Sequence, residues 1–260
     1  GAARNQGGDD GAALLAQATG KPVKLLFTRR ESLLVHPKRH ATQIRVRLGA
    51  KQDGTLTAAE TELYGDTGAY ASLGVVVMTR ATTHSCGPYI IPHSHADCYA
   101  MYTNNPPAGA FRGFGVVQAA FGIESAIDML AKELNIDPMA MRKKNCLHIG
   151  STTNTGHFLT ESVGLPECLD AISTWWAENG ISDPFQPQTE EISGQNLITC
   201  WGLACGFKNT GLGTGADDSS GVILKLLPAG RLQIKSGASE VGQGMVTTLQ
   251  LIAAEVLNIL

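Results

Sequence analysis

The sequence has no long apolar segment and no concentration of basic charge. Its longest apolar run, around residues 75–78, is far shorter than the roughly 20 residues that a membrane-spanning helix needs. The first residues lack the basic-then-apolar pattern of a secretion signal. The net charge is −3, and the lysines and arginines are scattered, so no nucleic-acid-binding surface is indicated. We therefore expect a cytoplasmic protein that binds neither membrane nor nucleic acid.

Motifs for a directly bound metal, a phosphate or a catalytic nucleophile are also missing. The six cysteines are widely spaced, with no CxxC pair and no HExxH, so we expect free thiols and no metal held by direct protein ligation. His93 and His95 lack a third ligand nearby, and we interpret them as part of a solvated loop. There is no GxxxxGK[ST] loop and no GxSxG elbow, and the glycine-rich segment 211–216 ends in alanine where a dinucleotide-binding fingerprint needs its third glycine. Any metal would have to arrive within a cofactor.

What the sequence does contain is a mixture of helical and strand-like segments without regular β–α alternation, which favours an α+β fold. Apolar spacing and stop signals predict helices over residues 12–18, 116–134, 138–145, 165–178 and 246–257. Alternating or apolar runs predict strands over 22–28, 202–207, 221–227 and 231–236, and a hairpin that joins 44–48 to 55–64 through Asp53-Gly54. Residues 65–109, rich in glycine and proline, are expected to be mainly loops.

The same pattern predicts a domain organisation. Residues 1–11 are polar and glycine-rich and are interpreted as a truncated or disordered start. A first domain is expected over 12–160, followed by a helix and a surface linker over 161–196 and by the beginning of a second domain over 197–260.

The segment Ala110-Phe-Arg-Gly-Phe-Gly115 carries the strongest functional signal because it places an arginine between aromatic residues and glycines just before a long helix. Glycines let a bound group approach the backbone, the arginine supplies directed donors to an anionic or oxo acceptor, and a helix N-terminus favours negative charge. Such a loop suits a large anionic cofactor. Taken alone, the hexapeptide slightly favours the alternative of a packed glycine turn that carries an exposed arginine.

Further motifs occur around this segment in a fixed order. They are Gly20-Lys-Pro-Val-Lys24, Thr28-Arg-Arg-Glu31, Arg39-His40, Gly65-Asp-Thr-Gly-Ala-Tyr70, Gly87-Pro-Tyr89, Thr103-Asn-Asn-Pro-Pro107, Gln118, Asp137-Pro138, Met141-Arg-Lys-Lys-Asn145 and Glu240-Val-Gly-Gln-Gly244. Together they closely resemble the molybdenum-binding portion of the xanthine dehydrogenase/aldehyde oxidase family over about residues 12–260. The resemblance implies two molybdopterin-binding subdomains, of which the second is incomplete, so we expect the chain to be part of a larger protein.

The resemblance also implies roles for individual residues. By position, Phe111, Arg112 and Gly113 resemble residues that line the molybdenum and the pterin, and Phe114 resembles a ring that stacks on an aromatic substrate. Around the cofactor-contacting glutamine, the matching positions are Gly242, Gln243 and Gly244. Arg80 aligns with an arginine that holds the substrate in some purine-oxidising members, with a structural or surface arginine as the alternative.

The chain departs from the family pattern at three points. A Gly-Gly-Phe-Gly-type loop is expected before the first helix, and residues 1–10 do not reproduce it. Near Leu212 some members place a second stacking aromatic, which this chain lacks. The family's catalytic base is a glutamate farther toward the C-terminus than Leu260, and neither Glu31 nor Glu240 matches it by position. The catalytic residue is therefore unknown, and we expect residues 1–260 alone to be inactive.

By resemblance, the parent enzyme hydroxylates an N-heterocycle, xanthine-like or nicotinate-like, or an aldehyde, with oxygen from water. Its cofactor is molybdenum-molybdopterin, alone or as a dinucleotide, and electrons leave through iron–sulfur and FAD groups on partner domains or subunits. The motif loop lacks the active-site cysteine of related carbon monoxide dehydrogenases, which disfavours that branch. The alternative hypothesis is a catalytically inactive cofactor-binding or assembly module of the same fold.

Overall fold

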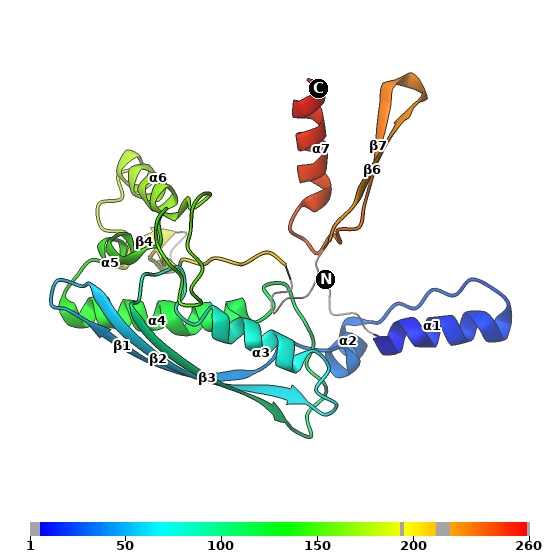
Figure 1. Cartoon of the computed structure of the whole chain (residues 1–260), viewed down its shortest axis with the longest axis horizontal. Coiled ribbons are helices and arrows are strands. Elements are labelled where there is room, and N and C mark those ends of the chain that lie inside the picture. The colour runs from blue at the N-terminus through cyan, green and yellow to red at the C-terminus, as the bar shows by residue number, and fades with distance from the viewer. Residues whose placement is uncertain (1–5, 193–194, 212–218, 259–260) are drawn as a thin grey trace. The chain divides into compact units, whose positions relative to one another are not determined.

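The computed structural model describes residues 6–192, 195–211 and 219–258, which contain both helices and strands (Figure 1). In chain order the elements are α1 (Gln6–Thr19), α2 (Arg29–Val35), β1 (Thr42–Ala50), β2 (Leu56–Gly68), α3 (Gly74–Thr83), β3 (His93–Tyr102), α4 (Val116–Leu134), α5 (Pro138–Asn145), α6 (Leu165–Glu178), β4 (Gln188–Ile192), β5 (Gln195–Thr199), β6 (Val222–Leu227), a short 3-10 turn η1 (Pro228–Gly230), β7 (Arg231–Ser236) and α7 (Met245–Leu257). None of the helices in these ranges is long and apolar enough to cross a membrane.

The described residues form two compact units. Unit 1 contains the chain up to Arg39, the segment Pro106–Arg112 and the chain from Asn209 onward, whereas unit 2 contains His40–Asn105 and Gly113–Lys208. The motif at 110–115 is therefore divided, with its arginine in unit 1 and its second phenylalanine in unit 2.

Unit 2 is built on a three-stranded sheet in the order β1-β2-β3, in which β1 pairs antiparallel with β2 and β2 pairs parallel with β3. Helices α3 and α4 lie against one side of this sheet (Figure 1). The main apolar core includes Leu56 of β2 together with Ile123 and Ile127 of α4, all nearly fully buried. A second core cluster joins Leu63 of β2 to Met78 of α3.

Capping residues mark the start of α5 and the end of α4 in unit 2. Asp137 caps α5 by accepting a hydrogen bond from the backbone N–H of Ala140 at 2.8 Å, and Pro138 occupies the first turn, where its missing N–H costs nothing. Helix α4 ends at Asn135, whose left-handed conformation lets its N–H reach the carbonyls of Ala131 and Lys132.

Unit 1 contains α1, α2, the antiparallel β6–β7 hairpin and α7. A capping box starts α2, because the hydroxyl of Thr28 accepts from the N–H of Glu31 while the Glu31 carboxylate accepts from the N–H of Thr28. Much of the apolar surface of this unit is exposed, including Leu224 of β6 and Leu251 of α7.

The α+β fold class is confirmed, and so are most of the predicted elements. The hairpin of β1 and β2, helices α4, α5 and α6, strands β6 and β7 and helix α7 lie within one or two residues of their predicted starts, although β2 extends beyond its predicted end to Gly68. Helix α1 starts six residues before the predicted Ala12, so part of the expected irregular start is helical.

Four predictions of secondary structure are wrong. Residues 22–28 and 202–207 are not strands, since an apolar run becomes a strand only where a neighbour supplies its hydrogen bonds. Residues 65–109 are not mainly loops, because they contain α3 and β3, and the predicted loop at His93 and His95 is the start of β3. Within 161–196, where a helix and a surface linker are expected, the structure has α6 and also β4, which pairs antiparallel with β5. The predicted domain limits themselves stay a prediction.

Candidate functional site

Thr103 and Asn105, which precede the motif, are hydrogen-bonded to Asp66 near the end of β2. Asp66 accepts a hydrogen bond from the hydroxyl of Thr103 at 2.6 Å through Oδ1 and another from the side-chain amide of Asn105 through Oδ2. The backbone N–H of Ala69 donates to the carbonyl of Asn105 at 2.9 Å. Hydrogen bonds from Thr103 and Asn105 hold the pKa of Asp66 below its ordinary value. Because β2 and β3 run parallel, the chain that follows β2 and the chain that follows β3 leave the sheet at the same end of the strands.

The glycines of the motif are required by its backbone conformation. Gly113, Phe114 and Gly115 all have positive φ, at 92°, 48° and 94°. A Cβ on Gly115 would lie 2.0 Å from the carbonyl oxygen of Val77, so α3 approaches the start of α4 too closely for any side chain. Phe114 is the only residue of the three that carries a Cβ in this left-handed region, which costs about 1–2 kcal/mol. Strain of this kind, held by the surrounding structure, is typical of functional loops.

In unit 1, Phe111 and Arg112 of the motif are both in contact with Arg39. Nη2 of Arg39 donates to the backbone carbonyl of Arg112 at 2.8 Å. The Arg39 guanidinium carbon also lies 5.6 Å from the centroid of the Phe111 ring, within the range of a cation–π interaction.

Arg112 itself reaches a distant motif. Its Nη1 donates to the backbone carbonyl of Gly242 at 2.8 Å, across 130 residues of sequence. This hydrogen bond joins Arg112 of the Ala110–Gly115 motif to the Glu240–Gly244 segment within unit 1.

The loop that Arg112 contacts is organised by its own side chains. The Glu240 carboxylate accepts hydrogen bonds from the N–H groups of Gly242 at 2.7 Å, Gly244 at 3.2 Å and Val246 at 3.1 Å, and the bond from Val246 is the largest cause that lowers the Glu240 pKa. Gln243 accepts from the N–H of Val241 at 2.6 Å through Oε1 and donates to the Ser239 carbonyl at 3.0 Å through Nε2. Glu240 thus occupies the N-terminus of α7.

The donors in this part of unit 1 fit the anionic, hydrogen-bonding cofactor that the sequence predicts. The Arg112 side chain is exposed, and only one of its five N–H donors is used by Gly242 among the contacts of the described residues. The Gln243 amide has a second N–H and a second lone pair beyond those bound in the loop. Because the Glu240 carboxylate already accepts hydrogen bonds at the α7 N-terminus, an anion near this loop would meet the Arg112 guanidinium and not the helix N-terminus.

Arg80 belongs to unit 2 and lies on α3. Its side chain is only 8% exposed, so it is not a surface arginine, whereas a structural role remains the alternative to substrate binding. Nδ1 of His84, one turn later, is 2.9 Å from the Arg80 carbonyl oxygen, and the His84 ring packs on Phe207 with centroids 4.8 Å apart. Burial, followed by the charge of Arg80, lowers the pKa of the neighbouring Lys208.

One buried cluster was not predicted as a site or as a structural network. Glu124 on α4 accepts from the N–H of Cys205 at 2.9 Å, from Nε of Arg142 at 2.9 Å and from the hydroxyl of Tyr89. Burial, followed by the charge of Glu124, raises the pKa of the Tyr89 phenol far above its usual range, so Tyr89 remains a donor. The backbone N–H of Cys205 is thereby bound to Glu124 of α4 and is not available for pairing with a strand.

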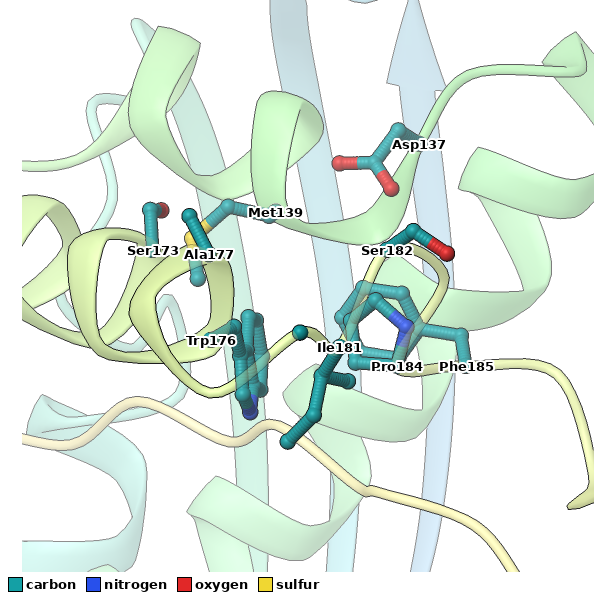
Figure 2. A pocket seen from close by; sticks show the side chains of 10 residues that line it. Asp137, Met139, Ser173, Trp176, Ala177, Ile181, Ser182, Pro184 and Phe185 are labelled. Carbon is teal, nitrogen blue, oxygen red and sulfur yellow. The ribbon is translucent and has the colours of Figure 1, made fainter.

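A pocket of about 450 Å³ lies elsewhere in unit 2, between α5, α6 and the turn that follows α6 (Figure 2). It is lined by Met139, Trp176 and Phe185, with the Asp137 carboxylate at one side. That carboxylate already caps α5, and none of the predicted site residues lines the pocket. In the described ranges, no group of three or more His, Cys, Asp or Glu side chains is arranged to hold a metal ion.

The predicted site residues are thus distributed over both units. Phe111, Arg112, Gly242, Gln243 and Gly244 lie in unit 1, and Arg80, Gly113 and Phe114 lie in unit 2. The roles predicted for them stay predictions. The glycine-rich segment 211–216 and Leu212 fall, except for Gly211, outside the described residues.

The chain matches known protein families over most of its length. Residues 9–146 match a family model described as a molybdopterin cofactor-binding domain, and residues 182–260 match a second model of the same description. The chain is 48% identical over 158 residues to the nicotinate dehydrogenase large molybdopterin subunit of Eubacterium barkeri, with 61% of this chain and 37% of that protein covered. It is 36% identical over 247 residues to a probable xanthine dehydrogenase subunit of Bacillus subtilis, with 95% and 32% covered.

A solved structure shows the same similarity. The aldehyde oxidoreductase of Desulfovibrio gigas superposes with a TM-score of 0.59 at 33% identity, over 64% of this chain and 18% of that one. The chain spans about a third of the length of the two curated relatives.

Proposed function

Because the chain belongs to the xanthine dehydrogenase/aldehyde oxidase family of molybdenum hydroxylases, we propose that it is the molybdenum-cofactor-binding part of an oxidoreductase that hydroxylates an N-heterocycle or an aldehyde with oxygen from water. The observation that carries this proposal is the 2.8 Å hydrogen bond from Arg112 to the Gly242 carbonyl. It joins, in one unit, the two segments that resemble cofactor-lining segments in the family.

Each residue has a task that its geometry supports. The Arg112 guanidinium, anchored at one N–H, offers its others to a negatively charged oxygen of the cofactor. The Gln243 amide, held by Val241 and Ser239, presents its remaining donor and acceptor in a fixed direction. Phe114 would stack on an aromatic substrate. When bound, the molybdenum cofactor supplies the two-electron oxidation, and the protein binds, orients and polarises.

An N-heterocycle is the favoured substrate class. The 48% identity to a nicotinate dehydrogenase subunit supports it, and so does the position of Arg80, whose buried cation suits a carboxylate or carbonyl substituent. The similarity to an aldehyde oxidoreductase keeps aldehydes as the second class. Iron–sulfur and FAD groups on partner domains or subunits, and a cytoplasmic location, complete the proposal.

The test is to purify the intact protein, measure its molybdenum and pterin content, and follow cofactor reduction on adding xanthine, nicotinate or an aldehyde. Stoichiometric molybdenum with substrate-dependent reduction is expected. Stoichiometric cofactor without reduction by any substrate would favour the inactive binding or assembly module, and absence of cofactor would contradict the proposal. Residues 1–260 alone are expected to show no turnover with an artificial acceptor, because the family's glutamate base has no match among them.

A further inference from the structure

Arg39 lies where the chain before β1 pairs with the segment that leads into the motif. Lys38 and Ala108 form an isolated parallel bridge, and the N–H of Gly109 donates to the Lys38 carbonyl at 2.8 Å. The backbone next to Arg39 is therefore fixed against the backbone three to four residues before Arg112. All of these residues belong to unit 1.

From this position, the Arg39 side chain makes two contacts with consecutive motif residues. Its Nη2 donates to the Arg112 carbonyl at 2.8 Å, which restrains the peptide that follows Arg112. Its guanidinium lies 5.6 Å from the centroid of the Phe111 ring, which restrains the preceding side chain. A planar guanidinium can make both contacts at once, whereas a lysine ammonium is a point charge without that geometry.

These contacts continue to the second motif. Arg112, held at its carbonyl by Arg39, uses its own guanidinium to hold the Gly242 carbonyl at 2.8 Å. Three segments that are distant in sequence are thus linked by two arginines in series. A displacement of the Arg112 guanidinium would therefore also change the position of the Gly242 carbonyl and of the loop that carries Gln243.

We propose that Arg39 is a positioning residue that fixes Phe111 and Arg112 in the orientation needed to bind the cofactor. The proposal rests on the proposed function. Arg39 does not need to touch the cofactor, and its effect passes through the Arg112 carbonyl and the Phe111 ring. Side chains that orient the residues in direct contact with a metal cofactor commonly affect affinity or activity by about 10–100-fold.

The test compares Arg39→Gln and Arg39→Lys with wild type in the intact protein. Arg39→Gln is expected to lower the molybdenum-to-protein ratio or kcat/KM about tenfold. It is also expected to speed hydrogen exchange in peptides that cover 106–112, where the Gly109 N–H is bonded. Arg39→Lys is expected to be intermediate, because it keeps the charge and loses the planar group.

The matched control is Arg45→Gln, since Arg45 is also an exposed arginine but pairs with Glu62, at 3.3 Å, on the sheet of unit 2. It should leave molybdenum content and exchange over 106–112 unchanged. In a Phe111→Leu background, Arg39→Gln should have a smaller effect than in wild type, because one of its two contacts is already lost.

The inference is overturned if the Arg39→Gln protein matches wild type in molybdenum content, kcat/KM and exchange over 106–112. It is also overturned if Arg39→Gln and Arg45→Gln have equal effects, or if Arg39→Lys matches wild type. If wild type itself carries no molybdenum, the proposed function fails first, and faster exchange over 106–112 in Arg39→Gln alone would show that Arg39 still orders this segment without a cofactor role.

Discussion

The Glu124 carboxylate and the Arg142 guanidinium form an ion pair inside unit 2, with Oε2 of Glu124 2.8 Å from Nη2 of Arg142 and side chains that are 7% and 0% exposed. Nη1 of Arg142 is also 2.7 Å from Oδ1 of Asp128. With the Tyr89 hydroxyl and the Cys205 N–H on the same carboxylate, this pair ties α4, α5 and two loop segments together. Because both charges are buried, removing the Glu124 charge leaves the Arg142 guanidinium paired only with the half-exposed carboxylate of Asp128.

Glu124→Gln is therefore expected to lower the free energy of unfolding by about 3–5 kcal/mol, the range found when one partner of a buried ion pair is lost. Urea denaturation followed by circular dichroism measures it. Glu62→Gln is the control, because Glu62 pairs with Arg45 at the surface and should cost no more than about 1 kcal/mol. Equal losses for the two variants would show that the Glu124 pair contributes no more than a surface pair.

Gly115→Ala is expected to destabilise unit 2 and to distort the motif. The added Cβ would meet the Val77 carbonyl oxygen at 2.0 Å, and the φ of 94° is unfavourable for alanine. The steric clash with Val77 and the strain of a left-handed alanine together should lower the free energy of unfolding by about 2–5 kcal/mol. Thermal or urea denaturation measures this loss.

Gly202→Ala is the matched control, because its Cβ would meet nothing within 4 Å and its φ is not in the left-handed region. We expect a change within about 0.5 kcal/mol there. If Gly115→Ala were as well tolerated as Gly202→Ala, the close approach of α3 to the start of α4 would be refuted.

Much of the fold follows from local sequence signals. Helix α4 was predictable because its apolar residues recur at helical spacing, and the β1–β2 hairpin was predictable because alternating residues flank Asp53-Gly54. Strand β3 was missed because its first five residues, HSHAD, are polar or small, and it is its parallel pairing with β2 that makes this segment a strand.

The candidate site was predictable only in part. The order of the motifs identified Arg112 and Gln243 as candidate cofactor-binding residues. No sequence rule predicts that Arg112 donates to a carbonyl 130 residues away. The contacts of Arg39 were missed for the same reason. Glu124 was not recognised because a glutamate on an amphipathic helix is normally solvated, and its partners Arg142 and Cys205 come from distant segments.

The stability contributed by Asp66 should depend on pH in the acid range. Hydrogen bonds from Thr103 and Asn105 place its pKa in the folded protein below the ordinary value of 3.8. The contribution is therefore fully present above the unfolded pKa and is lost as pH falls through the lower, folded pKa. We expect the difference in unfolding free energy between wild type and Asp66→Asn to be constant near neutral pH and to shrink below about pH 4.

Urea denaturation of both proteins at a series of pH values checks this dependence. Thr103→Val supplies the control, because it removes one of the donors that lower the Asp66 pKa. In that background the pH-dependent part of the difference should decrease. A difference that does not vary between pH 7 and pH 3 would mean that the Asp66 hydrogen bonds do not favour its charged form.

Arg80→Met tests whether the buried arginine of α3 recognises substrate. A charge-assisted hydrogen bond is worth about 1.5–3 kcal/mol, so its loss should lower kcat/KM by about 10–100-fold for heterocycles that carry a carboxylate or carbonyl group. The decrease should be small for a simple aldehyde, which has no carboxylate and no second carbonyl besides the reacting group. Steady-state kinetics on the intact protein measures both, and the melting temperature shows whether folding is retained.

Arg47→Met is the control for the loss of an arginine, since Arg47 pairs with Glu60 at the surface of the sheet. It should leave kcat/KM unchanged for every substrate. If Arg80→Met lowered kcat/KM equally for heterocycles and aldehydes while the melting temperature fell, Arg80 would have the structural role instead. Its 8% exposure and the contact of its carbonyl with His84 would then be explained by packing of α3 alone.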